Sequence, residues 1–255
     1  MIDSHCHLNL PPLHTNLEGV LAAAEAVGVH HFFVPAIQRA CWPQLRILNQ
    51  WPQLSVAIGL HPCFAHNVEA DLAAMTTQLS QPHPFVAIGE CGLDGVAGQL
   101  PMPEQQALCA AQLQLAIEHH LPVLLHVRQA HNELLQLLKR HPLPAGGIVH
   151  GFSGSIELAR QYVRHGLLLG IGGVCTYPRA RKTQITVSQL PLSALVFETD
   201  SPDMPPLGFQ GQPNQPKRLP AIIKHVAQLR QQSMGSLVAA QRQNLRALFP
   251  HLVAE

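Results

Sequence analysis

The chain has 255 residues, of which 47% are apolar and 12% charged, and its formal net charge is +1. A chain this long and this apolar can bury a large core, which excludes wholesale disorder, and the near-neutral charge excludes a protein that coats long stretches of nucleic acid. A protein that grips one nucleic-acid end, or a small phosphate, remains allowed.

Short apolar runs rich in β-branched residues recur along the whole chain and predict eight strands. In chain order they are Met1–Ile2 (leading into His5), Phe32–Val34, Val56–Ile58, Phe85–Ile88, Val123–Leu125, Ile148–Val149, Leu167–Ile171 and Leu195–Phe197. Their spacing is that of alternating strand–helix units, and continuous apolar strands are typical of parallel sheets buried on both faces. Eight such units predict an α/β fold of the (β/α)8 TIM-barrel class. An open doubly wound sheet would be expected to carry a G-x-G-x-x-G motif after an early strand, and the sequence contains none.

Helical periodicity fills the segments between these runs. It is found at residues 17–27, 108–115, 134–138, 155–166, 221–229 and 237–248. The stretch Pro202–Pro220 holds six prolines and predicts a long, rigid loop over the barrel mouth. Since no break in composition divides the chain, we expect residues 1–255 to form a single domain.

Two features bear on where the protein works. No apolar run is long enough to span a bilayer, and Asp3, His5 and His7 stand where a signal peptide would need basic and apolar residues. The six cysteines are scattered, without a C-x-x-C pair, which is typical of reduced thiols. We therefore expect a cytoplasmic protein with no membrane contact, and nothing indicates an obligate protein partner.

Imidazoles and carboxylates stand at the ends of five predicted strands. They are His5, His7, Glu90, His126, His150 and Asp200. In a (β/α)8 barrel the carboxyl ends of all strands meet on one face, which carries the active site. Four nitrogen ligands and two carboxylates exceed the needs of one tetrahedral ion, and they favour a pair of divalent cations. The alternative is that these residues are polar caps of the strands.

Two cations in one site need a bridging anion, and none of the four lysines ends a predicted strand, so Glu90 is the expected bridge. One ion is expected on His5, His7, Glu90 and Asp200, and the other on Glu90, His126 and His150. A water held between the ions is the expected nucleophile, with Asp200 orienting it or accepting its proton, which makes Glu90 and Asp200 the catalytic residues. Such mixed ligands suit Zn²⁺ or Mn²⁺ better than Mg²⁺, although Mg²⁺ could support activity.

Four further residues are candidate substrate contacts. Arg128 lies just past His126 and could bind a phosphate oxygen. The others are His61 after the third strand, Ser153 before a helix N-terminus, and Arg179 in a basic cluster with Arg181 and Lys182. For Arg128, Ser153 and the basic cluster, an ordinary surface or loop role is the alternative. Asp94 and Glu198 are expected to orient ligands or brace loops.

The sequence resembles the TatD family of metal-dependent deoxyribonucleases, (β/α)8 barrels of the amidohydrolase type. The resemblance rests on seven segments in the family's order: Asp3–Leu8, Gly59–Pro62, Ala87–Asp94, Gln112–Ala116, Leu121–Arg128, His150–Ser155 and Phe197–Pro202. Residues 176–180 and 208–216 are most similar to its YjjV-type branch. The resemblance implies hydrolysis of phosphodiester bonds with two divalent cations, often 3′→5′ trimming of DNA ends. The family's metal positions fall on the six residues chosen above.

The chain departs from the family pattern at three places. Cys91 replaces an aliphatic residue beside Glu90, Gln215 stands in Asn214–Pro216 where Glu is usual, and Asp203–Met204 replace an aromatic–leucine pair. The last two lie where substrate would be gripped, so two rival functions stay open. The same metals could hydrolyse a small amide, lactone or phosphate ester, or they could stabilise a non-catalytic scaffold.

Overall fold

The computed structural model describes residues 1–250 and residue 252. By their contacts these residues divide into two compact units. The first unit consists of Met1–Val34 together with the residues from His150 onward, and the second is Pro35–Val149. That residues 1–255 form one domain stays a prediction.

All eight predicted strands are present. They are β1 (Ile2–Asp3), β2 (His31–Pro35), β3 (Leu54–Ile58), β4 (Phe85–Asp94), β5 (Val123–Arg128), β6 (Gly147–Val149), β7 (Leu167–Ile171) and β8 (Leu195–Phe197), in the sheet order β1 to β8. Within the first unit β1 pairs with β2 and β7 with β8, and within the second unit β3, β4, β5 and β6 pair in succession. Every one of these pairings is parallel, as alternating strands and helices require.

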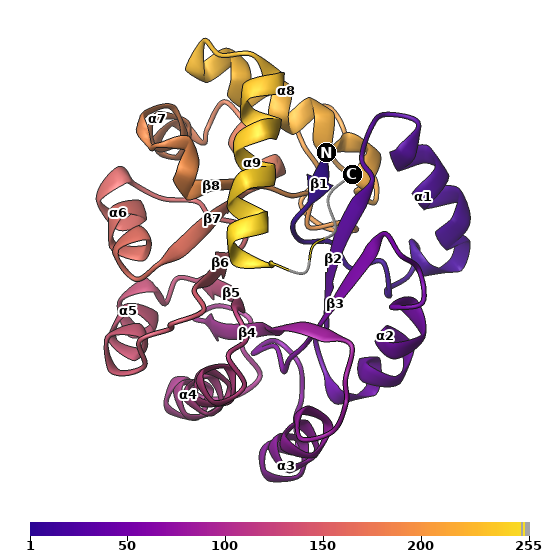
Figure 1. Ribbon diagram of the computed structural model, residues 1–255. Coiled ribbons are helices and arrows are strands. Elements are labelled where there is room, and N and C mark those ends of the chain that lie inside the picture. Colours follow the sequence, from indigo (N-terminus) through magenta and orange to yellow (C-terminus); the bar gives the residue numbers. More distant parts are fainter. Residues whose placement is uncertain (251, 253–255) are drawn as a thin grey trace. The chain divides into compact units, whose positions relative to one another are not determined.

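Helices follow the strands in regular alternation. In the described chain they are α1 (Leu17–Glu25), α2 (Trp42–Leu48), α3 (Val68–Leu79), α4 (Met102–Glu118), α5 (His131–Arg140), α6 (Ile156–Arg164), α7 (Arg181–Gln189), α8 (Leu219–Arg230) and α9 (Met234–Leu248). In the second unit, α2, α3, α4 and α5 all lie on the same side of its four strands (Figure 1). None of these helices is long and apolar enough to cross a membrane.

In the second unit, side chains of the helices fix the loop that follows β3. Gln112 of α4 accepts a hydrogen bond from the Leu60 amide at 2.8 Å and donates one to the Leu60 carbonyl at 3.0 Å. Trp42 of α2 donates its indole N–H to the carbonyl of Gly59 at 3.3 Å. Because these polar groups are buried and paired, the backbone just before His61 has a defined position.

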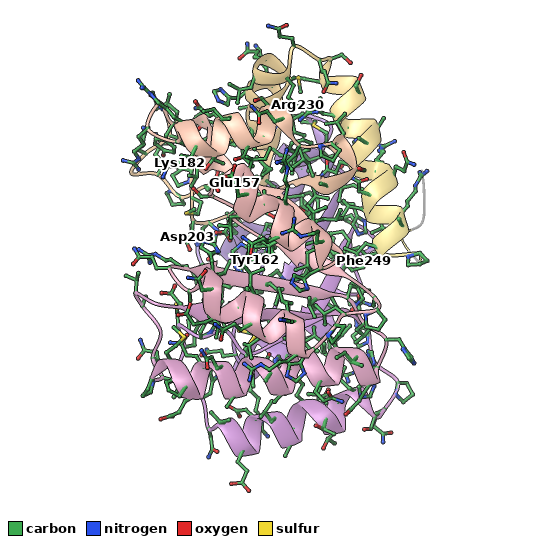
Figure 2. The ribbon with its side chains drawn as sticks, turned by 90° about the vertical axis from the view of Figure 1, so that its left-hand side faces the viewer. Glu157, Tyr162, Lys182, Asp203, Arg230 and Phe249 are labelled. Atoms are coloured by element: carbon green, nitrogen blue, oxygen red, sulfur yellow. The ribbon has the colours of Figure 1, made fainter. Side chains whose placement is uncertain are left out.

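In the first unit, α9 joins the strands at the two ends of the sheet order. The side-chain amide of Gln241 donates to the carbonyls of Ile2 in β1 and Phe197 in β8, both at 2.8 Å. Tyr162 of α6 is fully buried, and Arg230 at the end of α8 donates to carbonyls at the end of α7 (Figure 2). The segments that carry the ends of β1 and β8 are therefore held by buried hydrogen bonds.

The proline-rich stretch is a loop as far as Gln215, and it ends earlier than predicted because a short 3₁₀ helix (Pro216–Arg218) leads there into α8. The loop is fixed at several points. Tyr177 donates its hydroxyl to the carbonyl of Pro205, and the Thr176 hydroxyl accepts from the Leu207 amide, both at 2.8 Å. The side-chain amide of Asn214 donates to the carbonyl of Thr199 at 2.7 Å. Side chains at its apex, Leu207 and Phe209 among them, stay exposed.

Six strands have boundaries that differ from those predicted, and of these β2, β3 and β6 are only one or two residues longer. β4 continues past Glu90 to Asp94, and β5 continues past His126 through Arg128. Their polar side chains interrupt the apolar pattern, but the pairing resumes beyond the register shift at Glu90. β1 ends at Asp3, so His5 and His7 lie beyond the strand and not on it.

Candidate metal centre

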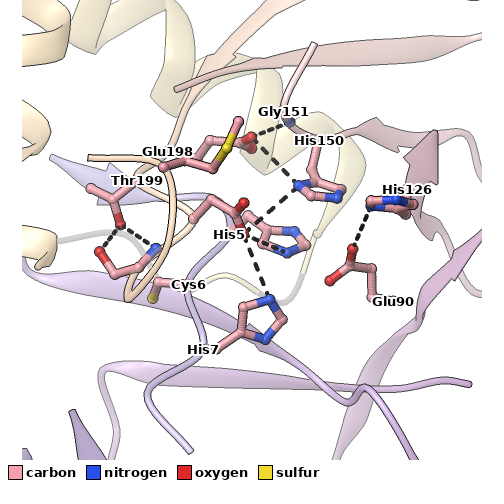
Figure 3. Close-up of polar contacts among 12 residues, drawn as sticks. His5, Cys6, His7, Glu90, His126, His150, Gly151, Glu198 and Thr199 are labelled. Atoms are coloured by element: carbon pink, nitrogen blue, oxygen red, sulfur yellow. Dashed lines mark hydrogen bonds and ion pairs between the residues drawn. The ribbon is translucent and has the colours of Figure 1, made fainter. Parts of the chain in front are cut away.

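In the first unit, three imidazoles surround the carboxylate of Asp200. The Nε2 atoms of His5 and His7 each lie 3.6 Å from Asp200 Oδ1, and His150 Nδ1 lies 4.0 Å from the same oxygen (Figure 3). The rings of His5 and His150 stack with their centroids 3.9 Å apart. We call these four residues the first ligand set. Its three rings are all buried, with His5 wholly inaccessible to solvent.

Backbone hydrogen bonds hold the two segments of this set together. The Asp200 amide donates to the carbonyl of His5 at 2.9 Å, and the His7 amide donates to the carbonyl of Ser201 at 2.7 Å. Asp200 itself has φ +55°, the left-handed conformation that Asp and Asn tolerate better than most residues. The segments after β1 and β8 therefore run side by side, which brings His5, His7 and Asp200 together without an extended strand.

Two further carboxylates lie fully buried beside the first ligand set. Asp3 accepts hydrogen bonds from the amide and hydroxyl of Thr199 at 2.9 and 2.6 Å, yet burial raises the pKa of Asp3 to about 7. Glu198 accepts from the Gly151 amide and approaches His150, but burial raises its pKa to about 8 (Figure 3). A nearby divalent cation stabilises the ionised form of a carboxylate, which burial disfavours. The environment of Asp3 and Glu198 is therefore suited to a bound metal ion.

In the second unit, two imidazoles converge on Glu90. His61 Nε2 lies 2.9 Å and His126 Nδ1 3.2 Å from Glu90 Oε1. On its other side, His126 Nε2 lies 2.9 Å from Asp94 Oδ2. We call His61, Glu90, Asp94 and His126 the second ligand set. A carboxylate behind an imidazole is the usual device that fixes the ring of a metal-binding histidine.

A local irregularity of β4 gives Glu90 its position. The pairing of β4 with β5 shifts between Gly89 and Cys91, so Glu90 is an extra residue with no partner in the register. Its amide donates instead to the carbonyl of Ala36 at 2.8 Å. Bulges of this kind redirect a side chain, and they are frequent beside active sites.

Asp94 is held as a carboxylate by several donors. Burial by itself would raise its pKa, but hydrogen bonds from His126, from the amides of Ala97 and Val96, and from the Cys63 thiol hold the pKa of Asp94 well below its usual range. Conversely, burial and the bond to Asp94 raise the pKa of Cys63 to about 12.

The candidate substrate contacts lie in different surroundings. His61 is buried and directed at Glu90, while Arg128 is exposed at the end of β5. The exposed Ser153 shares a hydrogen bond with Thr183 at 3.0 Å, and the guanidinium of the exposed Arg179 lies 5.0 Å from the ring centre of Tyr177. The structure therefore places His61 in the second ligand set. Ser153 and Arg179 instead contact Thr183 and Tyr177, which belong to neither ligand set.

Cys63 is a member of the centre that motif reasoning missed. Its sulfur, with one ring nitrogen each from His61 and His126, forms a group of metal-type ligand atoms that lie within 4.8 Å of one another. The same holds for His5, His7 and Asp200. The spacing His61–Cys63 was the available signal, but nothing in the sequence places His126 next to it.

Both ligand sets consist of neutral nitrogen donors and carboxylates, the donors that Zn²⁺ and Mn²⁺ prefer. Such centres activate water for attack on carbonyl or phosphoryl groups. Imidazoles and carboxylates at the ends of parallel strands in a (β/α)8 fold define a metal-dependent hydrolase.

Comparison with known proteins supports the same class of enzyme. The family model described as "TatD related DNase" matches residues 2–250, and the chain belongs to the TatD family of metal-dependent hydrolases. YjjV of Escherichia coli strain K12, an uncharacterized metal-dependent hydrolase, is 39% identical over 251 residues, which cover 97% of each chain. The 3′-5′ ssDNA/RNA exonuclease TatD of Erwinia tasmaniensis is 36% identical over 198 residues, which are 75% of this chain and 76% of that one.

The crystal structure of YjjV from Escherichia coli K12 superposes with a TM-score of 0.94 at 40% identity and covers 98% of both chains. The predicted (β/α)8 fold class and the resemblance to the TatD family are thereby confirmed, including the likeness to the YjjV-type branch.

Proposed function

We propose that the protein is a two-metal phosphodiesterase that trims DNA from the 3′ end. The observation that carries this proposal is the pair of buried imidazole–carboxylate sets, one around Asp200 and one around Glu90. Relatives that share 29–37% identity bear the name of a 3′-5′ ssDNA/RNA exonuclease, which supports a nucleic-acid end as the substrate.

We infer that the two sets serve one binuclear centre at the carboxyl face of the strands. The support is the fold class, since the donors follow or end parallel strands whose carboxyl ends meet on one face of a (β/α)8 fold. One ion is assigned to His5, His7, Glu90 and Asp200, and the other to Glu90, His126 and His150. When bound, two Zn²⁺ or Mn²⁺ ions supply Lewis acidity and lower the pKa of a water.

Asp200 is the proposed proton acceptor for the attacking water. Its side chain is 13% exposed, whereas those of His5, His7 and His150 are 0%, 8% and 6% exposed, so Asp200 is the member of the first ligand set that water reaches most easily. Three imidazole rings within 4.0 Å of one of its oxygens keep the carboxylate oriented. Glu90, with two imidazole nitrogens near one oxygen, is the proposed bridging ligand.

The proposed phosphate contact is Arg128. Arg128 is exposed at the end of β5, where it pairs with Asp94 in the register. Its guanidinium is therefore accessible to a phosphate and can donate hydrogen bonds to two phosphate oxygens at once. His61, Ser153 and Arg179 are proposed as further contacts. A near-neutral chain suits a substrate gripped through one or two phosphates.

The test is turnover by the metal-loaded full chain on four substrate classes: end-labelled single-stranded DNA, a nitrophenyl phosphodiester, a phosphomonoester, and an amide or lactone. Release of single nucleotides from the 3′ end supports the proposal. If only the amide, lactone or monoester is hydrolysed, the function is that of a small-molecule hydrolase. If His126→Ala lowers thermal stability in a protein that turns over none of these substrates, the centre is a structural one.

Arg128→Ala sharpens the test. We expect the KM for the phosphodiester to rise about tenfold with unchanged metal content, because one charge-assisted contact is lost. Arg140→Ala, an exposed arginine at the end of α5, is the matched control and should have no effect. An unchanged KM for Arg128→Ala would remove Arg128 from the substrate site.

We also infer a cytoplasmic location. All six cysteines are free, as expected for a protein kept in a reducing compartment.

A further inference from the structure

Cys63 occupies an unusual position for a cysteine in this chain. The other five cysteines are buried, whereas Cys63 is half-buried in the loop after β3. It is also the one cysteine in any group of metal-type ligands found among the described residues. Its surroundings are polar, and all of the contacts described below lie within the second unit.

Two contacts tie Cys63 to the second ligand set. Its thiol donates to Asp94 Oδ2 at 3.4 Å, and the same oxygen lies 2.9 Å from His126 Nε2. Its amide donates to His61 Nδ1 at 3.1 Å. This bond leaves Nε2 as the protonated nitrogen of the His61 ring, facing Glu90. The sulfur is thus held among nitrogen and oxygen donors by its own backbone and side chain.

We propose that Cys63 is a sulfur ligand of a divalent metal ion, with His61 and His126 as nitrogen ligands. The inference deepens the proposed metal centre, on which it rests, and it does not depend on the substrate. A sulfur ligand makes this position selective for ions that bind thiolates, such as Zn²⁺, Co²⁺ and Cd²⁺, over Mg²⁺ and Mn²⁺. His61 then acts as a ligand and not only as a substrate contact.

The geometry needs only a small adjustment. Ligand atoms of a tetrahedral zinc site lie roughly 3.5 Å apart, given Zn–N of about 2.0 Å and Zn–S of about 2.3 Å. The three atoms here lie within 4.8 Å of one another, so side-chain rotation of about 1 Å closes the site. On binding, the S–H bond of Cys63 breaks, its proton leaves to the buffer, and a metal–sulfur bond forms. The unprotonated Nδ1 of His61 exchanges the Cys63 amide for the metal, and its Nε2–H stays on Glu90. Asp94 keeps its bond to His126.

The test uses Co²⁺ as the probe on the full chain after removal of bound metals. A thiolate ligand gives an intense near-ultraviolet sulfur-to-cobalt charge-transfer band, whereas nitrogen and oxygen ligands give only weak visible bands. We expect the intense band in the wild type and its loss in Cys63→Ser, with the visible bands retained. Cys41→Ser, which changes a buried cysteine outside any ligand group, is the matched control and should keep the band.

Zn²⁺ affinity, measured by competition with a chelator, gives a second readout. Cys63→Ser should bind Zn²⁺ at least about tenfold more weakly while Mn²⁺ affinity stays unchanged, because only the soft ligand is lost. Thermal unfolding of the metal-free variants establishes that each one folds, and Cys63→His, which offers nitrogen in place of sulfur, should recover Zn²⁺ affinity without the band.

Each outcome decides the assignment. A wild type that shows visible cobalt bands but no charge-transfer band would refute the role of Cys63 and leave the metal centre standing. A charge-transfer band that persists in Cys63→Ser would also refute it. A wild type that binds no cobalt would overturn both the Cys63 assignment and the metal centre.

Discussion

Asp3 and Glu198, beside the first ligand set, have pKa values raised by burial to about 7 and about 8, whereas the pKa of Asp94 in the second set is held well below its usual range. Asp3 also accepts two hydrogen bonds, so the number of donors alone does not explain the difference. Asp3 and Glu198 are fully buried and lie near the negative charge of Asp200, while Asp94 has an imidazole and two backbone amides as donors.

This contrast indicates different tasks for the two regions. The first set lies beside buried carboxylates whose ionised form a bound cation would stabilise, which suits an ion that binds and activates water. The second set contains a carboxylate that is already ionised and already bonded to its histidine, which suits a preformed ligand position. Substitutions in the first region should therefore reduce turnover, whereas substitutions in the second region should reduce metal affinity.

The largest expected effect is that of Asp200→Asn. Asn tolerates the left-handed backbone of this position, so the fold should persist while the proton acceptor and a negative ligand atom are lost. We expect kcat/KM to fall by about 10²–10⁴-fold, measured on the substrate class that the wild type turns over. Glu118→Gln, which removes the charge of an exposed carboxylate at the end of α4, is the control. Near-normal turnover by Asp200→Asn would exclude Asp200 from the chemistry.

In the second region, Asp94→Asn should reduce metal affinity and leave the chemistry less affected. The Asn amide can replace one carboxylate oxygen for the amides of Val96 and Ala97, but its NH₂ group cannot accept a hydrogen bond from His126. We expect metal affinity to fall about 10–100-fold, with much of the activity restored at saturating metal. Asp71→Asn, a carboxylate of α3 in the same unit, is the control for loss of charge. An activity loss that excess metal does not repair would contradict the positioning role.

The sequence predicts most of this architecture because buried parallel strands consist of continuous apolar residues. All eight strands could be located from such runs. Its failures have physical causes. The polar residues Glu90 and Asp94 conceal the continuation of β4, since pairing depends on the backbone and not on side-chain polarity. The helix α7, Arg181–Gln189, lacks a clear apolar period and contains β-branched residues of low helix propensity, so packing in the folded chain must support it.

The candidate ligands could be named from the sequence because strand ends converge in this fold class, but their neighbours could not. Cys63 and His126 are separated by many residues, and their proximity arises only when the β3 loop and β5 come together. Likewise, the hydrogen bonds between Asp3 and Thr199 join positions that are 196 residues apart in the sequence. Contacts of this kind are set by tertiary packing and leave no local pattern.

The smallest expected effect concerns the space around Glu198, and it tests whether the first region depends on tight packing. A Cβ at Gly170 in β7 would lie 2.1 Å from Glu198 Oε2, whereas a Cβ at Gly172 would lie 3.7 Å from Glu198 Cγ, an ordinary contact. Gly170→Ala should therefore displace the Glu198 carboxylate from the Gly151 amide and lower the free energy of unfolding by about 1–3 kcal/mol in urea titrations. Gly172→Ala is the matched control, with the same chemical change two residues along the same segment.

If metal affinity falls in Gly170→Ala but not in Gly172→Ala, Glu198 supports the first ligand set by its position. Equal stability and equal metal affinity of the two variants would show that Glu198 can move without consequence, and that the carboxylates around His150 are not a rigid part of the centre.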